Sequence, residues 1–216
     1  MLNMNQEFDY GWKNEKPNHS HNYYLPAILS MLPPPVASTG EKIKILDLGC
    51  GNGSLTSKIA EQGFSVTGIE ESESGVKIAS ENFTNCSFFV GSIYDLKYQE
   101  QGLENAFDIV ISSDVIEHLF FPRKLIEASK KCLKPNGQLL ITTPYHGYWK
   151  NLALAISGKF DKHFTVLWDG GHIKFFSVKT LTQLLEESGF TDIKFDFVGR
   201  LPYLWKGMLS FATIKK

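Results

Sequence analysis

The chain has little of what would indicate a secreted or nucleic-acid-binding protein. Its 216 residues include three cysteines, Cys50, Cys86 and Cys132, which have no metal-binding spacing and would leave one thiol over if two were paired. We therefore expect a reducing compartment, with all three cysteines acting as small buried hydrophobic residues. The formal net charge of −1 gives no field that would gather a polyanion, so nucleic acid is not expected as a partner.

The sequence also lacks internal repeats, low-complexity segments and long apolar runs. Its first ten residues carry neither a basic start nor an apolar stretch long enough for a signal peptide or a transmembrane helix. We therefore expect a cytoplasmic, soluble protein without stable membrane insertion, and no pattern indicates an oligomeric state. Apolar material is plentiful, with 43% hydrophobic and 13% aromatic residues, which is enough for one core in a chain of this length.

Segments with strand character alternate with segments of helical period, a pattern typical of a parallel sheet covered by helices. The predicted strands of this part are 43–48, 65–70, 86–90, 107–112 and 137–143. The predicted helices are 20–31, 53–62, 73–82, 122–132 and 178–188. Two further strands, 191–198 and 208–215, are joined by a segment too short for a right-handed parallel crossover, so they must pair antiparallel. We predict an α/β, Rossmann-like seven-stranded sheet, five parallel strands plus a C-terminal antiparallel hairpin, with helices on both faces.

The most informative segment is 43–53, an alternating apolar strand that runs into Gly49, Gly51 and Gly53. Glycines at such a turn let backbone N–H groups approach a ligand that any Cβ would hold away. The acid Asp47 stands just before them, and a pyrophosphate would meet its carboxylate at close range, which is repulsive. The pattern D-x-G-x-G-x-G also differs from the dinucleotide motif G-x-G-x-x-G, so a ligand with positive groups fits this turn better.

This segment resembles motif I of the class I S-adenosylmethionine-dependent methyltransferases, whose cofactor carries an ammonium and a sulfonium. The resemblance implies that Asp47 orients the methionine end of S-adenosyl-L-methionine and that the glycine turn, with Cys50 inside it, passes close beneath the cofactor. Glu70 ends the second predicted strand about twenty residues further on, where a carboxylate can accept hydrogen bonds from both ribose hydroxyls. Glu71 follows immediately and is the alternative for the same role.

Two later strand ends extend the resemblance. After the third predicted strand, the family often has an acid followed by an apolar residue, and these two contact the adenine. In this chain Ser92 replaces the acid, and Ile93 packs either on the adenine or in the core. The segment 112–118, Ser-Ser-Asp-Val-Ile-Glu-His, resembles the motif that follows the fourth strand in ubiquinone-biosynthesis O-methyltransferases and many small-molecule methyltransferases. It implies that Ser112 or Ser113 offers a backbone carbonyl to the cofactor's ammonium.

Methyl transfer from a sulfonium is an in-line displacement, for which alignment of the reacting atoms supplies most of the acceleration. A base matters where the acceptor is a hydroxyl, and histidine has a suitable pKa. His118 is our first candidate for that base and His146 the second, against a structural hydrogen-bonding role for each. Asp114, Glu117 and His118 also have a spacing that suits a divalent metal, although we expect a charged helix start there rather than a metal.

Selection of the acceptor is expected from two regions rich in aromatic residues. One is an N-terminal cap segment and helix, 1–41, and the other is an insertion, 145–176, within a methyltransferase domain, 42–216. The candidate substrate-binding residues of these regions are Trp12, His21, Tyr24, Tyr145 and His172. We interpret the insertion as a lid over a hydrophobic or planar acceptor. The alternatives are an amphipathic helix at 148–156 whose aromatics fill the core, and an apolar surface that touches a membrane holding a lipid-like substrate.

These patterns predict a methyltransferase that uses S-adenosyl-L-methionine and acts on a small molecule, at oxygen in preference to nitrogen or carbon. A module that binds the cofactor without catalysis has the same glycine turn and the same acid after the second strand. A reductase that uses a nicotinamide cofactor is the third alternative. The non-catalytic module would bind S-adenosylmethionine without turnover. The reductase would bind NADH and not S-adenosylmethionine.

Overall fold

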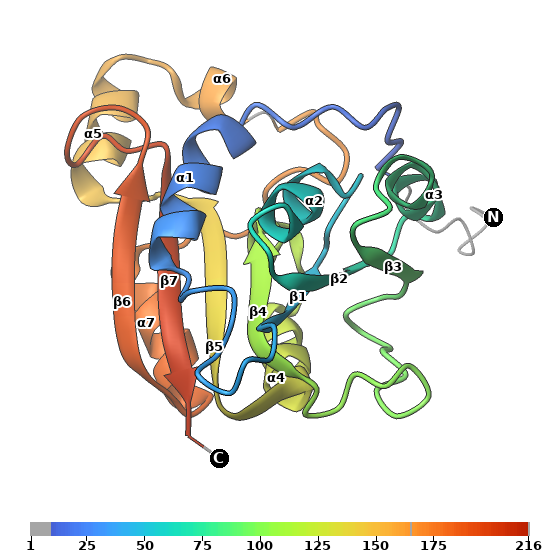
Figure 1. Ribbon diagram of the computed structural model, residues 1–216. Helices are drawn as coiled ribbons and strands as arrows, with labels where there is room; N and C mark the ends of the chain where they lie inside the picture. The colour runs from blue at the N-terminus through green and yellow to red at the C-terminus, as the bar shows by residue number, and fades with distance from the viewer. Residues whose placement is uncertain (1–9, 165, 216) are drawn as a thin grey trace.

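The computed structural model describes residues 10–164 and 166–215. In this part of the chain, seven strands form one sheet in the order β3-β2-β1-β4-β5-β7-β6 (Figure 1). The strands are β1 (Lys44–Leu48), β2 (Ser65–Glu70), β3 (Ser87–Val90), β4 (Phe107–Ser113), β5 (Leu133–Pro144), β6 (Phe190–Val198) and β7 (Gly207–Ile214). The helices are α1 (His21–Met31), α2 (Ser54–Ala60), α3 (Glu73–Asn82), the 3₁₀ helix η1 (Ile116–His118), α4 (Pro122–Cys132), α5 (Tyr148–Ile156), α6 (Phe160–Phe164) and α7 (Val178–Glu187).

The sheet is parallel from β3 to β5, and β7 is inserted antiparallel between β5 and β6. The predicted fold, five parallel strands and an antiparallel hairpin, is therefore confirmed. The predicted start of the fifth strand, residue 137, is wrong, because β5 begins at Leu133, which pairs with Phe107. Pro135 and Asn136 are residue types common in turns, and Asn136 adopts a φ of +60°, but the strand passes through this irregularity without ending.

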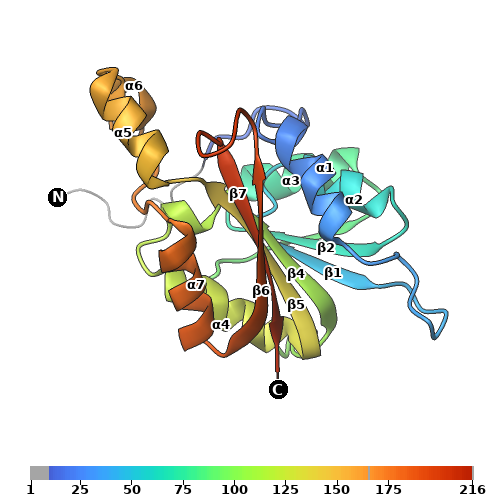
Figure 2. The ribbon, with the colours of Figure 1, turned by 90° about the vertical axis from the view of Figure 1, so that its left-hand side faces the viewer.

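Helices cover both faces of the sheet, as predicted. Figure 2 shows α1, α2 and α3 on one face and α4 and α7 on the other. The alternation of side chains along β1 illustrates how both layers are filled, because Ile45 packs with the α1 and α2 side chains while Leu46 packs in the cluster that includes α4 and α7. This two-sided burial explains why the neighbouring residues Ile45 and Leu46 are both apolar and both fully buried.

Helices α5 and α6 follow β5 and extend away from the body of the domain (Figure 2). Tyr148 is 73% exposed and Trp149 59% exposed, so the aromatic side chains at the start of α5 do not fill the core, which contradicts that alternative. No helix among the described residues combines the length and the apolar character needed to cross a membrane.

Candidate functional site

A cavity of about 780 Å³ lies at the carboxyl ends of β1, β2 and β4. Open α/β sheets bind ligands at this edge, and the volume suits a nucleoside-sized ligand together with an acceptor. Its walls come from the glycine turn before α2, the ends of β2 and β4, η1, the N-terminal segment and the loop after α6. Sequence segments that lie far apart therefore meet at one site.

The glycine turn forms the floor of this cavity. It is fixed to the neighbouring strand because the backbone N–H groups of Gly49 and Cys50 both donate to the carbonyl of Ile69, at 2.8 and 3.0 Å. Gly51 has a φ of +56°, and a Cβ built on it would lie 2.5 Å from Cζ2 of the Trp12 indole. Both the backbone conformation and the close packing at this position require glycine.

Asp47 places a buried carboxylate at the base of the cavity. Its Oδ2 accepts a hydrogen bond of 2.6 Å from the Thr56 hydroxyl, while its Oδ1 has no partner among the described residues. Burial raises the pKa of Asp47 to about 7, and the negative charge of Glu70 adds to this rise, while the Thr56 hydrogen bond opposes it. A buried carboxylate oxygen without a donor is a site for a hydrogen-bond donor or a cation.

Glu70 is oriented by two backbone hydrogen bonds. Its Oε2 accepts from the Gly51 N–H at 2.9 Å and its Oε1 accepts from the Ser72 N–H at 3.0 Å. Burial is the main cause of a raised pKa at Glu70, and these two hydrogen bonds lower it. Each carboxylate oxygen keeps acceptor capacity for a ligand hydroxyl. Both Glu70 and Glu71 line the cavity, but Glu71 is exposed.

The other predicted cofactor residues divide between the cavity and its surroundings. Cys50, Ile93 and Ser113 line the cavity. Ser92 does not, and its hydroxyl accepts a hydrogen bond from the N–H of Tyr94 at 3.3 Å. Ser112 is fully buried within the sheet, where its hydroxyl donates to the Leu48 carbonyl at 2.8 Å. Of the two serines that end β4, only Ser113 therefore reaches the cavity.

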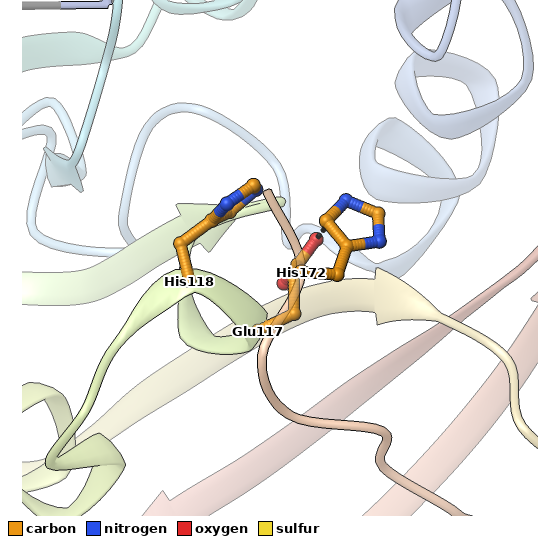
Figure 3. Close-up of side chains that lie close together, drawn as sticks. All are labelled: Glu117, His118 and His172. Atoms are coloured by element: carbon orange, nitrogen blue, oxygen red, sulfur yellow. Dashed lines mark ion pairs between the residues drawn. The ribbon is translucent and has the colours of Figure 1, made fainter. Parts of the chain in front are cut away.

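Two histidines line the cavity, and a buried glutamate lies beside them. Figure 3 shows Glu117 and His118 from η1 facing His172 from the loop after α6. Nδ1 of His118 lies 2.7 Å from the Gly170 carbonyl oxygen, and Nε2 of His172 lies 4.0 Å from Oε1 of Glu117. The loop is held in place because the N–H groups of residues 173 and 174 both donate to the Glu117 carbonyl. Burial lowers the pKa of His118 and lowers that of His172 to about 4, so both rings are neutral at pH 7.

The hydrogen bond of His118 determines which of its ring nitrogens is available. A carbonyl oxygen can only accept, so Nδ1 carries the proton and Nε2 keeps its lone pair. A neutral imidazole in this tautomer can take a proton from a ligand hydroxyl.

The arrangement that could hold a metal differs from the predicted one. Ligand atoms of Glu117, His118 and His172 lie within 4.8 Å of one another, whereas Asp114 is hydrogen-bonded to Ser20, to Tyr24 and to a side chain of β5. One oxygen of Glu117 accepts from the Thr143 hydroxyl, and the other has no hydrogen-bond partner in the described chain. Two imidazoles and one carboxylate suit Zn²⁺ better than Mg²⁺, which prefers oxygen ligands. Without a cation, burial raises the pKa of Glu117 well above its usual range.

Of the predicted acceptor residues, Trp12, His21 and His172 line the cavity, and Tyr24 and Tyr145 do not. Tyr24 is 1% exposed and packs between α1 and the start of β7. The Tyr145 ring packs against the rings of Phe197 and Trp205, with centroid distances of 5.5 and 5.3 Å.

His146, the second candidate for a base, also lies outside the cavity lining. Its ring packs beside those of Phe164 and Phe175, at centroid distances of 6.0 and 5.0 Å. Burial, and then the charge of Lys150, lowers the pKa of His146 to about 4. Of these two histidines, only His118 lines the cavity.

Sequence reasoning missed two supporting residues. Thr56 fixes Asp47, and the Asn52 side chain donates to the carbonyls of Asn14 and Lys16, both at 2.8 Å. Asn52 thereby ties the N-terminal segment to the glycine turn. The only sequence signal for these residues is their position, Asn52 within the glycine turn and Thr56 shortly after it.

The chain is similar in sequence to known methyltransferases. A family model described as a methyltransferase domain matches residues 18–194. The chain is 36% identical over 121 residues to a ubiquinone biosynthesis O-methyltransferase of Caulobacter vibrioides, an alignment that covers 55% of this chain and 47% of the relative. The chain thus spans about half the length of the first curated relatives that it matches.

Solved structures share the fold at low sequence identity. A possible histamine N-methyltransferase of Thermotoga maritima superposes with a TM-score of 0.65 at 18% identity, covering 88% of this chain and 87% of that one. The magnesium protoporphyrin IX methyltransferase of Synechocystis PCC 6803, solved with bound SAH, gives a TM-score of 0.63 at 17% identity, covering 89% and 80%. With a glycine turn, a buried acid beneath it and a family model over most of its length, this chain belongs to the class I S-adenosylmethionine-dependent methyltransferases.

Proposed function

We propose that this methyltransferase acts on a small-molecule acceptor and transfers the methyl group to an oxygen atom. The observation that carries the proposal is His118, a neutral imidazole on the cavity wall whose Nε2 keeps its lone pair because Nδ1 donates to the Gly170 carbonyl. Methylation of a hydroxyl requires a proton acceptor at some stage, and this nitrogen can serve. Relatives that are about one-third identical to this chain are named as ubiquinone biosynthesis O-methyltransferases, which supports oxygen as the methylated atom.

The residues present fit S-adenosyl-L-methionine, which supplies an electrophilic methyl group on its sulfonium. Oδ1 of Asp47 has an unused acceptor site for the ammonium, and Ser113, which lines the cavity, would offer its carbonyl as a second acceptor. Glu70 would accept hydrogen bonds from the ribose hydroxyls. These contacts hold the donor in one position, and alignment with the acceptor oxygen then supplies most of the acceleration.

The acceptor half of the cavity is apolar and aromatic. Phe164, Val166, Trp168 and Phe175 from the end of α6 and the loop after it line this part, together with Phe120 after η1. Flat apolar walls of this kind suit a planar ring, and the histidine on the same wall suits a phenolic hydroxyl. We therefore propose a phenol or catechol as the acceptor class.

The proposal is tested by transfer of a labelled methyl group from S-adenosylmethionine to a panel of catechols, phenols and amines. We expect label in catechols, and a 10²–10⁴-fold lower kcat for His118→Gln, the range for loss of a general base. His19→Gln is the matched control, because His19 is exposed and does not line the cavity.

The other outcomes identify the alternatives. Label in amines alone would indicate an N-methyltransferase. Binding of S-adenosylhomocysteine without turnover on any acceptor would indicate a non-catalytic module.

A second acceptor class, a lipid-like molecule held in a membrane, is favoured by one specific observation. Apolar side chains at the end of α5 and in the loop after α6 are strongly exposed, with Ile156 79%, Val166 80% and Leu167 95% accessible. Val166 also lines the cavity, so the exposed loop borders the acceptor half. Co-sedimentation with phospholipid vesicles distinguishes the two classes, because a protein that takes a dissolved acceptor stays in the supernatant.

A further inference from the structure

The N-terminal segment 10–21 crosses the cavity as a strap. It leads from the α3 side of the molecule to α1 (Figure 1). Asn52 holds the middle of the strap through the carbonyls of residues 14 and 16, and the Ser54 hydroxyl lies 3.2 Å from Nδ1 of His21 at its end. At its start, the Tyr10 ring meets the His118 ring edge-on, with centroids 5.8 Å apart. The strap is therefore fixed to the glycine turn and to α2.

The Trp12 side chain of the strap packs on the glycine turn. A Cβ built on Gly75, in the first turn of α3, would lie 2.9 Å from Cδ1 of the indole, and one built on Gly51 would lie 3.2 Å from Cε2. The ring nitrogen Nε1 is bonded to both of these indole carbons, so it lies between the glycine turn and the start of α3. The side chain of Glu70 borders the same place, because its Cγ lies 3.2 Å from the Cβ position of Gly75.

The indole nitrogen is buried, yet it has no hydrogen-bond partner within the described chain. Leaving a buried N–H unpaired is unfavourable, and such groups in native proteins require an explanation. The cavity of about 780 Å³ is present with the indole in place, so the ring borders this space and does not fill it. An acceptor supplied by a bound ligand would satisfy the N–H.

We propose that Trp12 belongs to the cofactor site and not to the acceptor site, and that its Nε1–H donates to a ribose hydroxyl of the bound nucleoside. A hydroxyl both donates and accepts, so the same ribose oxygen can donate to Glu70 and accept from Trp12. This inference rests on S-adenosylmethionine as the cofactor, and it is independent of which acceptor is methylated.

Calorimetric titration with S-adenosylhomocysteine tests the proposal on the full chain. Trp12→Phe keeps a ring over the turn and removes the N–H, and we expect it to weaken binding about 3- to 10-fold, the effect of one hydrogen bond. Trp12→Ala removes the ring as well and should weaken binding further. Trp149→Phe is the matched control, because this tryptophan lies on α5, is 59% exposed and does not line the cavity. Thermal unfolding of each variant shows that it is folded.

A second ligand locates the contact within the cofactor. 5′-Methylthioadenosine keeps the ribose and lacks the amino-acid end, so Trp12→Phe should weaken its binding by the same factor. If Trp12→Phe bound S-adenosylhomocysteine like the parent, the proposal would be wrong. If only S-adenosylhomocysteine were weakened, the N–H would face the amino-acid end and the ribose contact would be refuted. Failure to methylate any phenol would affect the proposed function alone, because these titrations need no turnover.

Discussion

Binding of S-adenosylhomocysteine should depend on pH through Asp47. The carboxyl group is buried, its pKa is raised to about 7, and its Oδ1 is unpaired in the described chain. A ligand ammonium beside this oxygen favours the ionised form, so it lowers the pKa of Asp47 in the complex. Binding below pH 7 must therefore release a proton, and affinity must rise as the pH increases through 7.

The size of the effect follows from that pKa. With a pKa near 7, about one-tenth of Asp47 is ionised at pH 6 and about nine-tenths at pH 8. If only the ionised form binds well, the association constant rises about tenfold over this interval, and about half a proton is released per ligand at pH 7.

Calorimetry in buffers of different ionisation enthalpy measures both the affinity and the proton release. Asp47→Asn should bind more weakly and lose this pH dependence, leaving only that of the ligand's own amino group. 5′-Methylthioadenosine, which lacks the ammonium, should bind the parent with little change between pH 6 and pH 8. The reasoning is refuted if Asp47→Asn retains the pH profile of the parent, or if no proton is released at pH 7.

Three further predictions concern the same cavity. Gly51→Val should abolish binding of S-adenosylhomocysteine, because the left-handed backbone and the Trp12 ring leave no room for a side chain; titration that shows parental affinity would contradict this. Glu70→Ala should weaken binding of S-adenosylhomocysteine by about 1–3 kcal/mol, whereas Glu71→Ala, at an exposed position, should change it little. If calorimetry showed the larger loss for Glu71→Ala, Glu71 and not Glu70 would bind the ribose. Chelation should leave methyl transfer unchanged, because burial raises the pKa of Glu117 and lowers those of both histidines, which favours uncharged groups that need no cation; activity that is lost with EDTA and restored by Zn²⁺ would show that the cluster binds metal.

The order of the elements could be predicted from sequence because it depends on local signals. Apolar alternation marks a strand, and glycine or proline ends it, so the strands and the antiparallel hairpin were placed correctly. The error at the start of β5 arose from the same signals, since Pro135 and Asn136 usually indicate a turn. Pairing of Leu133 with Phe107 extends the strand past them, and strand pairing is not a local property.

The sequence by itself also determined one wall of the site. Residues at the carboxyl ends of parallel strands must share one edge, which brings Asp47, Glu70 and Ser113 to a single cavity. Only the tertiary structure decided what faces them. Backbone hydrogen bonds from a distant loop bring His172 beside His118, and Asn52 ties the strap that carries Trp12 onto the glycine turn. These contacts join segments that are far apart in the chain, and a local sequence pattern does not predict which distant segment each of them will contact.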